Sequence, residues 1–175
     1  RTFTVPQATN AIALTPDGAL VAVSHRPTAE QLAAVPSMRA DKKAQKAGLK
    51  FRQMVSFYST ASGELQRTVP EVYDIIRGMG FDPEGKRLLV YSTQDPRAGV
   101  VPVSGGNAWN FSMVDLPGYV QQIDPNTGEP LRTGFQSLMN EPFLAVDPSG
   151  TTLALSSTEG RNKRKLTLYD IDSGD

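Results

Sequence analysis

Short apolar runs with a period of two recur along the chain, and pairs of these runs flank a Pro-x-Gly turn. A period of two is typical of a β-strand with one buried face. Proline presets φ at the first corner of a tight turn, and glycine supplies the positive φ that a side chain resists. The pattern therefore predicts β-hairpins, most clearly over residues 11–14 with 19–24 and over residues 143–146 with 152–156.

The Pro-x-Gly turn is part of an internal repeat. It occurs three times, as LTPDG ending at Gly18, FDPEG ending at Gly85 and VDPSG ending at Gly150. The second turn of each copy ends at Gly63, Gly128 and Gly174. In both places where another copy follows, 22 residues separate the glycine of the second turn from the next Pro-x-Gly glycine. The register of the repeat is therefore not a chance of composition.

Each copy of the repeat predicts four strands. After the hairpin, a third strand is clearest at residues 165–170, and the second turn leads to a fourth strand such as residues 65–69. Four antiparallel strands in a unit of about 46 residues are typical of a propeller blade. The predicted fold class is all-β, a β-propeller of four-stranded antiparallel blades with a short helical insertion in the first blade.

The third copy carries a family resemblance. Its LTLYDIDSG, residues 166–174, resembles the strand ending in an aromatic-Asp pair of bacterial WD-repeat-like and YVTN-type β-propellers. The aromatic residue is Tyr169 instead of tryptophan, and no Gly-His pair precedes the blades. The resemblance implies a propeller fold over nearly the whole chain. It implies no activity by itself, because this fold carries many unrelated functions.

The predicted blades cover residues of about 11–69, 76–133 and 143–175. Residues 1–6 are expected to form the outer strand of a preceding blade. Closed propellers have about 4 to 8 blades, and an open stack exposes the apolar faces of its end blades. We therefore expect these residues to be a portion of a larger propeller. The alternative is that several chains associate to close the ring.

Two copies contain additional segments, at residues of about 26–49 and 94–118. Both fall between the second and third strands of their blades, so we expect them to leave the propeller on the same face. The first segment predicts two helices. Thr28 and Gln31 match a capping box at the start of one helix, and Pro36 ends it. Ser37 is expected to cap a second helix over residues 38–47, with Gly48 at its end.

The charges are balanced overall but not locally. Eighteen basic and eighteen acidic side chains give no net charge, which argues against nucleic-acid binding by the whole surface. Basic residues gather instead on the first insertion and on the matching connection of the third blade. The candidate partner-binding residues of this kind are Arg39, Lys42, Lys43, Lys46, Arg161, Lys163 and Arg164. They predict docking of an acidic partner, with nucleic acid the least favoured; the alternative is a solvated charged surface.

The single tryptophan, Trp109, lies in the second insertion, which is rich in glycine and proline. An aromatic side chain on a loop offers a large contact area at little entropic cost, so Trp109 is the last candidate partner-binding residue. The alternative is that Trp109 holds its own loop against the body of the protein.

The sequence offers little for catalysis. His25 is the only histidine and cysteine is absent, so no metal site with several histidines and no thiolate chemistry is available. A lone histidine at a strand end is usually structural. Asp82 and Asp147 stand directly before the turn prolines, where they are expected to accept hydrogen bonds from turn amides. We therefore predict no enzyme activity, no cofactor and no metal site.

The function predicted from the sequence is a non-enzymatic β-propeller scaffold that binds another protein or an assembly through its insertion-bearing face. The remaining blades of the same propeller are further expected partners. One alternative is a propeller hydrolase or lyase whose catalytic groups lie in blades outside these residues, and another is a carbohydrate- or small-ligand-binding propeller. No apolar run approaches the roughly 18 residues of a membrane-spanning helix. The absence of cysteine and the start at Arg1 favour an extracytoplasmic compartment without deciding it.

Overall fold

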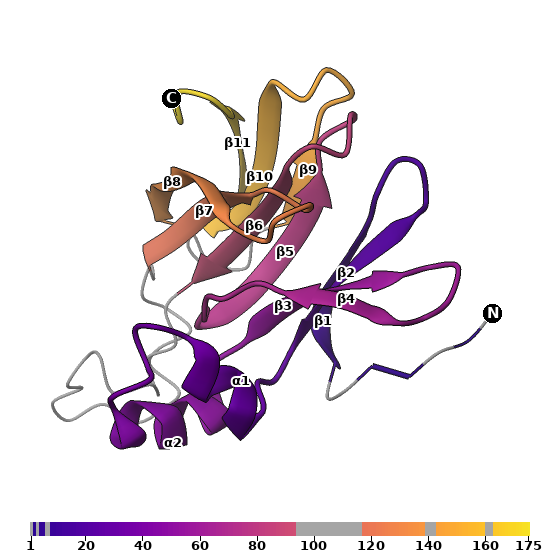
Figure 1. The fold of residues 1–175 in the computed structure, drawn as a ribbon. Helices are drawn as coiled ribbons and strands as arrows, with labels where there is room; N and C mark the ends of the chain where they lie inside the picture. The colour runs from indigo at the N-terminus through magenta and orange to yellow at the C-terminus, as the bar shows by residue number, and fades with distance from the viewer. Residues whose placement is uncertain (1, 3, 6–7, 94–116, 139–142, 160–162) are drawn as a thin grey trace, which may run out of the picture.

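In the part of the chain that it describes, the computed structural model shows three antiparallel sheets and two short helices (Figure 1). It describes residues 2, 4–5, 8–93, 117–138, 143–159 and 163–175. The first sheet contains β1 (Ala8–Leu14), β2 (Leu20–His25), β3 (Met54–Ser59) and β4 (Leu65–Thr68). The second sheet contains β5 (Ile75–Phe81), β6 (Leu88–Thr93), β7 (Pro117–Ile123) and β8 (Pro130–Leu138). The third sheet contains β9 (Phe143–Val146), β10 (Thr152–Glu159) and β11 (Lys163–Asp170).

Neighbouring strands in each sheet follow one another in sequence and pair antiparallel. The sequence predicts four strands per sheet, and the first two sheets have them. Three strands of the third sheet lie within the described residues, and Gly174 of its second turn is followed there by Asp175 alone, whereas β4 and β8 begin two residues after the glycine of the same turn. Residues 2, 4 and 5 are not in a strand. The outer strand expected over residues 1–6 stays a prediction.

The three Pro-x-Gly turns share one end of the molecule. Their glycines have φ between 69° and 72°, as the turn prediction requires. A side-chain carbon built on Gly85 would lie 3.3 Å from Cδ of Pro16, and one built on Gly150 would lie 2.9 Å from Cδ of Pro83. The second and third turns therefore each pack on the proline of the turn before them, which confirms the predicted common face.

The aspartates before the turn prolines act as expected. Asp82 accepts a hydrogen bond from the amide of Lys86 at 2.7 Å, and Asp147 accepts one from the amide of Thr152 at 2.7 Å. A hydroxyl bond from Ser149 and further amide bonds lower the pKa of Asp147. These local bonds fix the turn geometry in the second and third copies.

The second turn also recurs with the same hydrogen bonds in all three sheets. The amides of Gly63, Gly128 and Gly174 each donate to the carbonyl four residues earlier, at 2.8 Å. We call two residues in different sheets counterparts when they lie the same number of residues along the chain from the glycine of equivalent turns. This correspondence allows each position of one blade to be compared with the same position of the next.

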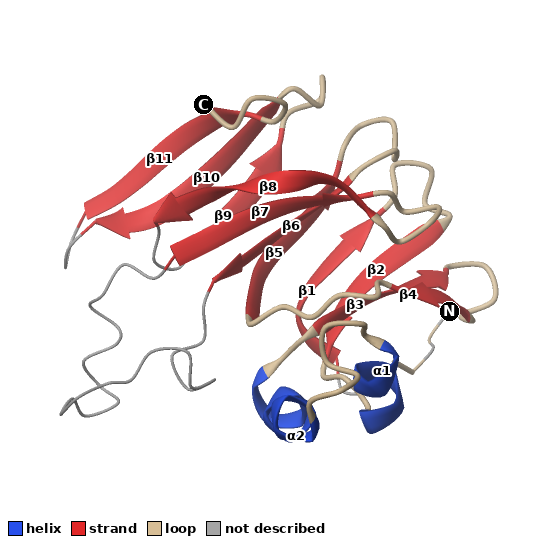
Figure 2. Cartoon of the chain, turned by 60° about the vertical axis from the view of Figure 1, so that its left-hand side comes forward, coloured by secondary structure: helices blue, strands red, loops and turns tan. Residues whose placement is uncertain are grey.

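The sheets pack face to face around their first strands. β1, β5 and β9 lie side by side in that order, and the other strands of each sheet extend outward from them (Figure 2). This is the radial arrangement of propeller blades. Glycines in β5 permit the close approach of β9, since a carbon built on Gly78 or Gly80 would lie 3.2 Å or 3.0 Å from Leu144.

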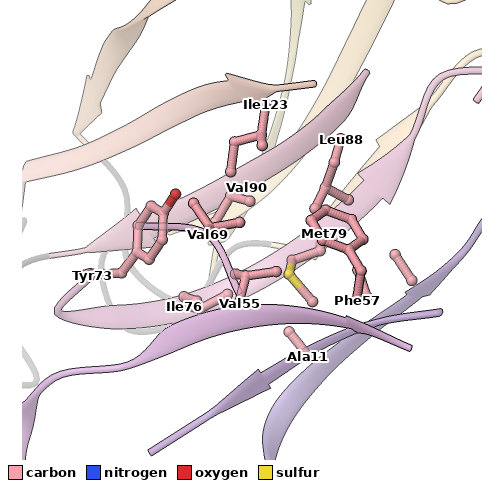
Figure 3. Close-up of a cluster of buried hydrophobic side chains, with 12 residues drawn as sticks. Ala11, Val55, Phe57, Val69, Tyr73, Ile76, Met79, Leu88, Val90 and Ile123 are labelled. Atoms are coloured by element: carbon pink, nitrogen blue, oxygen red, sulfur yellow. The ribbon is translucent and has the colours of Figure 1, made fainter. Parts of the chain in front are cut away.

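A buried apolar cluster fills the interface between the first and second sheets (Figure 3). The rings of Phe57 and Phe81 meet there with centroids 6.4 Å apart. The first sheet contributes Ala11, Ala13, Ala22, Val55 and Phe57, and the second contributes Ile76, Met79, Leu88, Val90 and Ile123. Val69 and Tyr73 come from the segment between β4 and β5.

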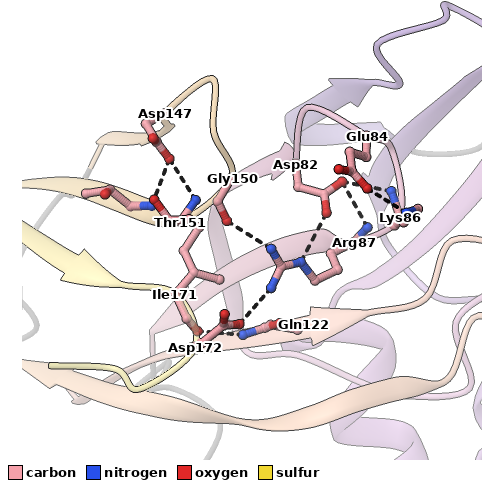
Figure 4. Close-up of polar contacts among 11 residues, drawn as sticks. Asp82, Glu84, Lys86, Arg87, Gln122, Asp147, Gly150, Thr151, Ile171 and Asp172 are labelled. Atoms are coloured by element: carbon pink, nitrogen blue, oxygen red, sulfur yellow. Dashed lines mark hydrogen bonds and ion pairs between the residues drawn. The ribbon is translucent and has the colours of Figure 1, made fainter.

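The interface between the second and third sheets combines a smaller apolar cluster with polar bridges (Figure 4). Its buried apolar residues are Leu89, Tyr91, Val120, Leu153, Leu155 and Ile171. Arg87 donates from Nη1 to Asp172 at 2.8 Å and from Nη2 to the Gly150 carbonyl at 2.9 Å. The amide of Gln122 donates to the Ile171 carbonyl at 2.8 Å. Both polar bridges cross from one blade to the next.

The first insertion forms two helices, α1 (Ala29–Ala34) and α2 (Lys42–Phe51). The capping box predicted at Thr28 and Gln31 is confirmed. The predicted bounds of the second helix are wrong at both ends. Asp41, not Ser37, is the N-cap, because its carboxylate accepts the amides of Lys43 and Ala44 at 2.9 Å.

Gly48 lies inside α2 and does not end it. A carbon built on Gly48 would lie 3.0 Å from Cδ1 of Leu32 in α1. The glycine is therefore needed for close packing of the two helices and not for a terminal turn. This packing partner lies sixteen residues away in the sequence, which is why a local helix-end rule misreads the position.

Candidate partner-binding face

The helical insertion leaves the first sheet at the end opposite the Pro-x-Gly turns (Figure 1). At this end β2, β6 and β10 finish, and β3, β7 and β11 begin. For example, His25 pairs with Met54, and Glu159 pairs with Lys163. The helices therefore project from the insertion-bearing face. Of the second insertion, only its ends at Thr93 and Pro117 belong to the described residues.

The helical insertion is a packed unit with its own apolar core. Leu32, Val35 and Met38 are buried against Met54 of β3. The side-chain amide of Gln45 in α2 donates to the Met38 carbonyl at 2.9 Å, which ties α2 to the turn before it. These contacts give the insertion a defined position on the first sheet.

A chain of hydrogen bonds also joins the insertion to the sheet. Gln31 Nε2 of α1 contacts Thr68 Oγ1 of β4 at 3.4 Å, and Thr68 Oγ1 contacts Ser56 Oγ of β3 at 2.7 Å. Ser56 Oγ lies 2.7 Å from Nε2 of His25, whose Nδ1 lies 2.8 Å from the Arg26 carbonyl oxygen. We name these five linked residues the His25 chain. It connects α1 with three strands of the first sheet.

The bonds of His25 assign its protonation state. A carbonyl oxygen can only accept, so Nδ1 carries the hydrogen and Nε2 accepts from the hydroxyl of Ser56. Burial lowers the pKa of His25 below its ordinary value of 6.5. His25 is thus a neutral, buried residue within a structural network, as the sequence interpretation expects of a lone strand-end histidine.

The exposed side of α2 is strongly basic. Lys42, Lys43, Lys46 and Lys50, here called the lysine arc, are all exposed. At 3.6 residues per turn they fall within an arc of about 100° around the helix axis. The opposite side faces α1 and includes the buried Gly48. No carboxylate among the described residues forms an ion pair with the lysine arc.

The structure groups some of the predicted binding residues and separates others. Arg39 is exposed in the turn before α2 and extends the basic surface. Lys163 and Arg164 are exposed at the start of β11, on the same face but across the width of the second sheet from α2 (Figure 2). Trp109 and Arg161 lie outside the described residues.

An open cleft of about 470 Å³ is lined by Arg52 at the end of the helical insertion, by residues 71–74 between β4 and β5, and by β6, β7 and β8 of the second sheet. Arg52, directly after α2, forms an ion pair with Asp74 at this cleft. Gln121 donates to the carboxylate of Glu71 at 3.4 Å. Burial, and secondarily the charge of Glu71, raise the pKa of Tyr73, so this phenol stays neutral. The cleft offers paired charges, an amide group and the side chains of Ser92 and Thr93.

The sequence places Lys50 among the basic residues of segment 26–52, but the candidate binding residues chosen from it did not include Lys50, and no pattern pointed to the cleft. Lys50 completes a series with Lys42 and Lys46 at a spacing of four, the spacing that places side chains on one helix face. The early end predicted at Gly48 hid this periodicity. The cleft residues come from three separated segments, near Arg52, Glu71 and Tyr119, and no local pattern connects them.

Within the described part of the chain, no group of three acidic, histidine or cysteine side chains could hold a metal ion. Neither of the helices that the structure describes has the length and apolar character needed to cross a membrane.

Comparison with known proteins identifies the fold. No family model and no curated protein matches the chain. Among solved structures, the chain is similar to TolB from Acinetobacter baumannii, with a TM-score of 0.55 and 12% sequence identity. The match covers 96% of this chain and 31% of that chain, so the chain spans about a third of the length of TolB. At this identity the likeness concerns the fold alone: the chain has a TolB-like β-propeller fold.

Proposed function

We propose that the chain is a non-enzymatic β-propeller scaffold, of the bacterial WD-repeat-like or YVTN type, that binds another protein or an assembly through its insertion-bearing face. The observation that carries the proposal is the lysine arc, four exposed lysines without carboxylate partners among the described residues. The partner surface that meets α2 is acidic, because a cluster of unpaired positive charges is favourable in an interface only when it faces negative charges.

The way α2 is held supports this function. The helix pair is packed through Leu32 and Gly48 and joined to the sheet by the His25 chain. A surface that is already ordered loses less conformational entropy when it binds. The third copy of the repeat shows that a blade of this fold needs no insertion to pack, since only residues 160–162 separate β10 from β11. The enlarged connection of the first blade therefore has a use other than packing.

The position of the histidine supports a function without catalysis by these residues. His25 is the one side chain with an ordinary pKa suited to general acid–base work at neutral pH. It is buried and both of its ring nitrogens are engaged within the protein. It therefore supports the insertion instead of reaching a substrate.

We also propose that further blades cover the two end sheets, because residues exposed there have counterparts that are buried. Leu166 of β11 is 67% exposed, whereas its counterparts Val55 and Val120 are fully buried by the following blade. Leu168 is 61% exposed, whereas its counterpart Phe57 is fully buried. The outer side of the third sheet thus has the character of a blade interface.

The first sheet has the same character on its opposite side. Ile12 of β1 is 71% exposed, and its counterpart Met79 is 9% exposed because the preceding blade covers it. Gly85 and Gly150 each contact the proline of the preceding turn, whereas no described atom lies within 4 Å of the same point on Gly18. The first sheet therefore offers both a side-chain surface and a turn surface to a preceding blade.

Lysine acylation of the native assembly, followed by mass spectrometry, tests the choice of face. The lysine arc reports on the insertion-bearing face, and the exposed Lys86 reports on the Pro-x-Gly face. We expect the lysine arc to react more slowly in the assembly than in the isolated chain, while Lys86 reacts equally in both. Protection of Lys86 with an unprotected lysine arc would assign the contact to the opposite face.

The cleft beside the second sheet favours a second candidate function, binding of a carbohydrate or another small polar ligand. Tyr119 is partly exposed there and presents an aromatic surface beside Glu71 and Gln121. Polar groups around an aromatic platform suit a ligand with both hydroxyl groups and an apolar face. Tyr119→Ala should abolish such binding in calorimetric titrations with a panel of neutral oligosaccharides, while leaving the acylation pattern of the lysine arc unchanged.

A further inference from the structure

We propose that the cleft lined by Arg52, residues 71–74 and the second sheet binds an organic cation, and that its ligand carries a guanidinium group. The inference rests on the ligand-binding function proposed for this cleft and names the class of ligand. It does not depend on the lysine arc. It is carried by three features of the cleft lining: a carboxylate without a cationic partner, an aromatic ring and a group of hydrogen-bond acceptors.

The alternation of side chains along the strands places three polar or aromatic groups on one face of the second sheet. Val120 packs in the apolar cluster with the third sheet, and Gln122 donates to a carbonyl of the next blade, so both face that blade. Tyr119 and Gln121 therefore face the opposite way. Ser92 of β6 is the direct cross-strand partner of Tyr119, so it lies on the same face. All three of these residues line the cleft.

The two carboxylates of the cleft differ in their partners. Asp74 forms an ion pair with Arg52, the one basic residue among those that line the cleft in the described chain. Glu71 forms no ion pair with a described residue and accepts only the side-chain amide of Gln121, at 3.4 Å. Glu71 is partly buried, and a carboxylate withdrawn from water gains from a cation beside it. The unpaired charge of Glu71 therefore favours a positive ligand.

Hydrogen-bond acceptors gather around Glu71. Gln121 donates to Glu71 through Nε2, which leaves Oε1 of Gln121 as an acceptor. Ser92 adds a hydroxyl group to the lining. Tyr73 is 6% exposed, and its hydroxyl is buried without a hydrogen-bond partner among the described residues. Such an orphaned group is costly. A ligand with several N–H donors matches this set of oxygen atoms, whereas a carboxylate or a phosphate, which offers only acceptors, does not.

Tyr119 supplies the aromatic part of the site. Its side chain is 41% exposed, and it shares a face with Gln121, whose amide reaches Glu71. The ring and the carboxylate therefore flank the same amide. A cation above a tyrosine ring is attracted by the negative face of the ring. A guanidinium is planar, so it can stack on this ring and use two of its five donors on the carboxylate, which a compact, strongly hydrated ammonium cannot do.

A pair of ligands with nearly the same shape and different charge tests the site. N-acetyl-arginine amide carries the guanidinium, and N-acetyl-citrulline amide carries a neutral urea group in its place. The side-chain amide signal of Gln121 in nuclear magnetic resonance spectra of the chain reports binding. The titrations use about 0.15 M salt, which screens the lysine arc beyond about 8 Å. We expect the arginine derivative to bind at least about tenfold more tightly than the citrulline derivative, and N-acetyl-lysine amide to bind more weakly than the arginine derivative.

Three variants assign the contributions of the carboxylate and the ring. Glu71→Gln keeps the size of the side chain and removes its charge, so the arginine derivative should bind about tenfold more weakly. Tyr119→Leu removes the aromatic face and should weaken binding by about two- to fivefold. Glu64→Gln makes the same charge change at an exposed site away from the cleft and should leave the affinity unchanged. Urea unfolding of each variant checks that the fold is kept.

Two sources can present the guanidinium: an arginine of the acidic partner proposed for α2, or a free small molecule. The cleft begins at Arg52, two residues after Lys50 of the lysine arc. A peptide with one arginine between aspartates separates the two sources. Binding about tenfold tighter than that of the arginine derivative, and weakened by Lys46→Glu, assigns the arginine to a protein partner. Equal affinity of the peptide and the derivative assigns a free guanidinium compound.

The arginine and citrulline comparison decides the inference without any variant. Equal binding of the two derivatives, or an unchanged affinity in a folded Glu71→Gln variant, would overturn it. Binding of neutral oligosaccharides without binding of the arginine derivative would also overturn it, while the cleft would remain a ligand site. If neither kind of ligand binds, the ligand-binding function of the cleft fails as well.

Discussion

The two blade interfaces of this chain are built on the same repeat and are held together by different chemistry. In the first sheet, Phe57 lies in the apolar cluster that faces the next blade, and Leu20 lies two residues after the glycine of the Pro-x-Gly turn. Their counterparts between the second and third sheets are Gln122 and Arg87, which make hydrogen bonds across the interface (Figure 4). The first interface therefore depends on apolar burial, and the second divides its stabilisation between a smaller apolar cluster and directed polar bonds.

The comparison shows what the repeat specifies. Strand register and turn geometry decide which positions meet the next blade, since alternate residues of a strand point to opposite faces. They do not decide whether these positions are apolar or polar. An apolar contact tolerates small shifts between blades, whereas the bonds of Arg87 to Asp82, Asp172 and Gly150 require one arrangement. The second interface should therefore be the more sensitive to single polar substitutions.

Truncation of Phe57 should have the largest effect, because it breaks the apolar interface at a fully buried ring. Phe57→Ala should lower the free energy of unfolding by about 3–5 kcal/mol, as large-to-small core substitutions do. Urea unfolding followed by circular dichroism measures this. The matched control Leu131→Ala, at a half-exposed site, should change the value by less than about 0.5 kcal/mol. A loss below about 1 kcal/mol for Phe57→Ala would contradict an interface maintained by burial.

Replacement of Arg87 by leucine, the residue that its counterpart Leu20 carries in the first sheet, tests the difference between the two interfaces. Arg87→Leu leaves the buried Asp82 carboxylate and the Gly150 carbonyl without their guanidinium donor, at a cost of about 1–3 kcal/mol. The neighbouring Lys86→Leu removes only an exposed ion pair with Glu84 and should cost less than about 1 kcal/mol. Equal losses in the two variants, measured by urea unfolding, would show that the bridge does not hold the second interface.

Acidification should lower the unfolding free energy through the first sheet, because the buried His25 belongs to that sheet. Its pKa is lowered on folding, so the unfolded chain binds the proton more readily and stability is lost as the pH falls below about 6.5. The slope cannot exceed about 1.4 kcal/mol per pH unit for one proton, and it vanishes below the lowered pKa.

Unfolding free energies measured between pH 7.5 and 5 should therefore decline in the wild type and stay level in His25→Gln. Hydrogen bonds also lower the pKa of Asp17 and Asp147, but these carboxyl groups act near and below pH 3.8, outside this window. A wild-type stability that is constant from pH 7.5 to 5 would be incompatible with burial of a neutral His25.

Charge reversal on α2 should have the smallest effect on folding and the clearest effect on binding. Lys42→Glu, Lys43→Glu and Lys46→Glu combined should change the unfolding free energy by less than about 1 kcal/mol, because these side chains are exposed. Association with the native partner should slow by about tenfold or more at low ionic strength and recover toward the wild-type rate at high salt. Lys86→Glu on the other face is the control, and an equal effect there would indicate non-specific attraction.

The sequence by itself determined the parts of this protein that depend on residues close together in the chain. Each Pro-x-Gly turn is formed by its own proline, glycine and aspartate, and the capping box by Thr28 and Gln31. These interactions span at most five residues, so a local pattern contains all the information needed for them. The repeat of these turns was sufficient to predict blades with antiparallel strands and a common turn face.

Only the tertiary structure decided the roles of Gly48, Arg87 and His25. Gly48 packs on Leu32 of another helix, Arg87 bonds to Gly150 and Asp172 of the next blade, and His25 bonds to Ser56 of a neighbouring strand. In each case the deciding partner lies 16 to 85 residues away. Glycine, arginine and histidine each permit several environments, and the one that occurs depends on which distant groups the packed sheets bring within contact.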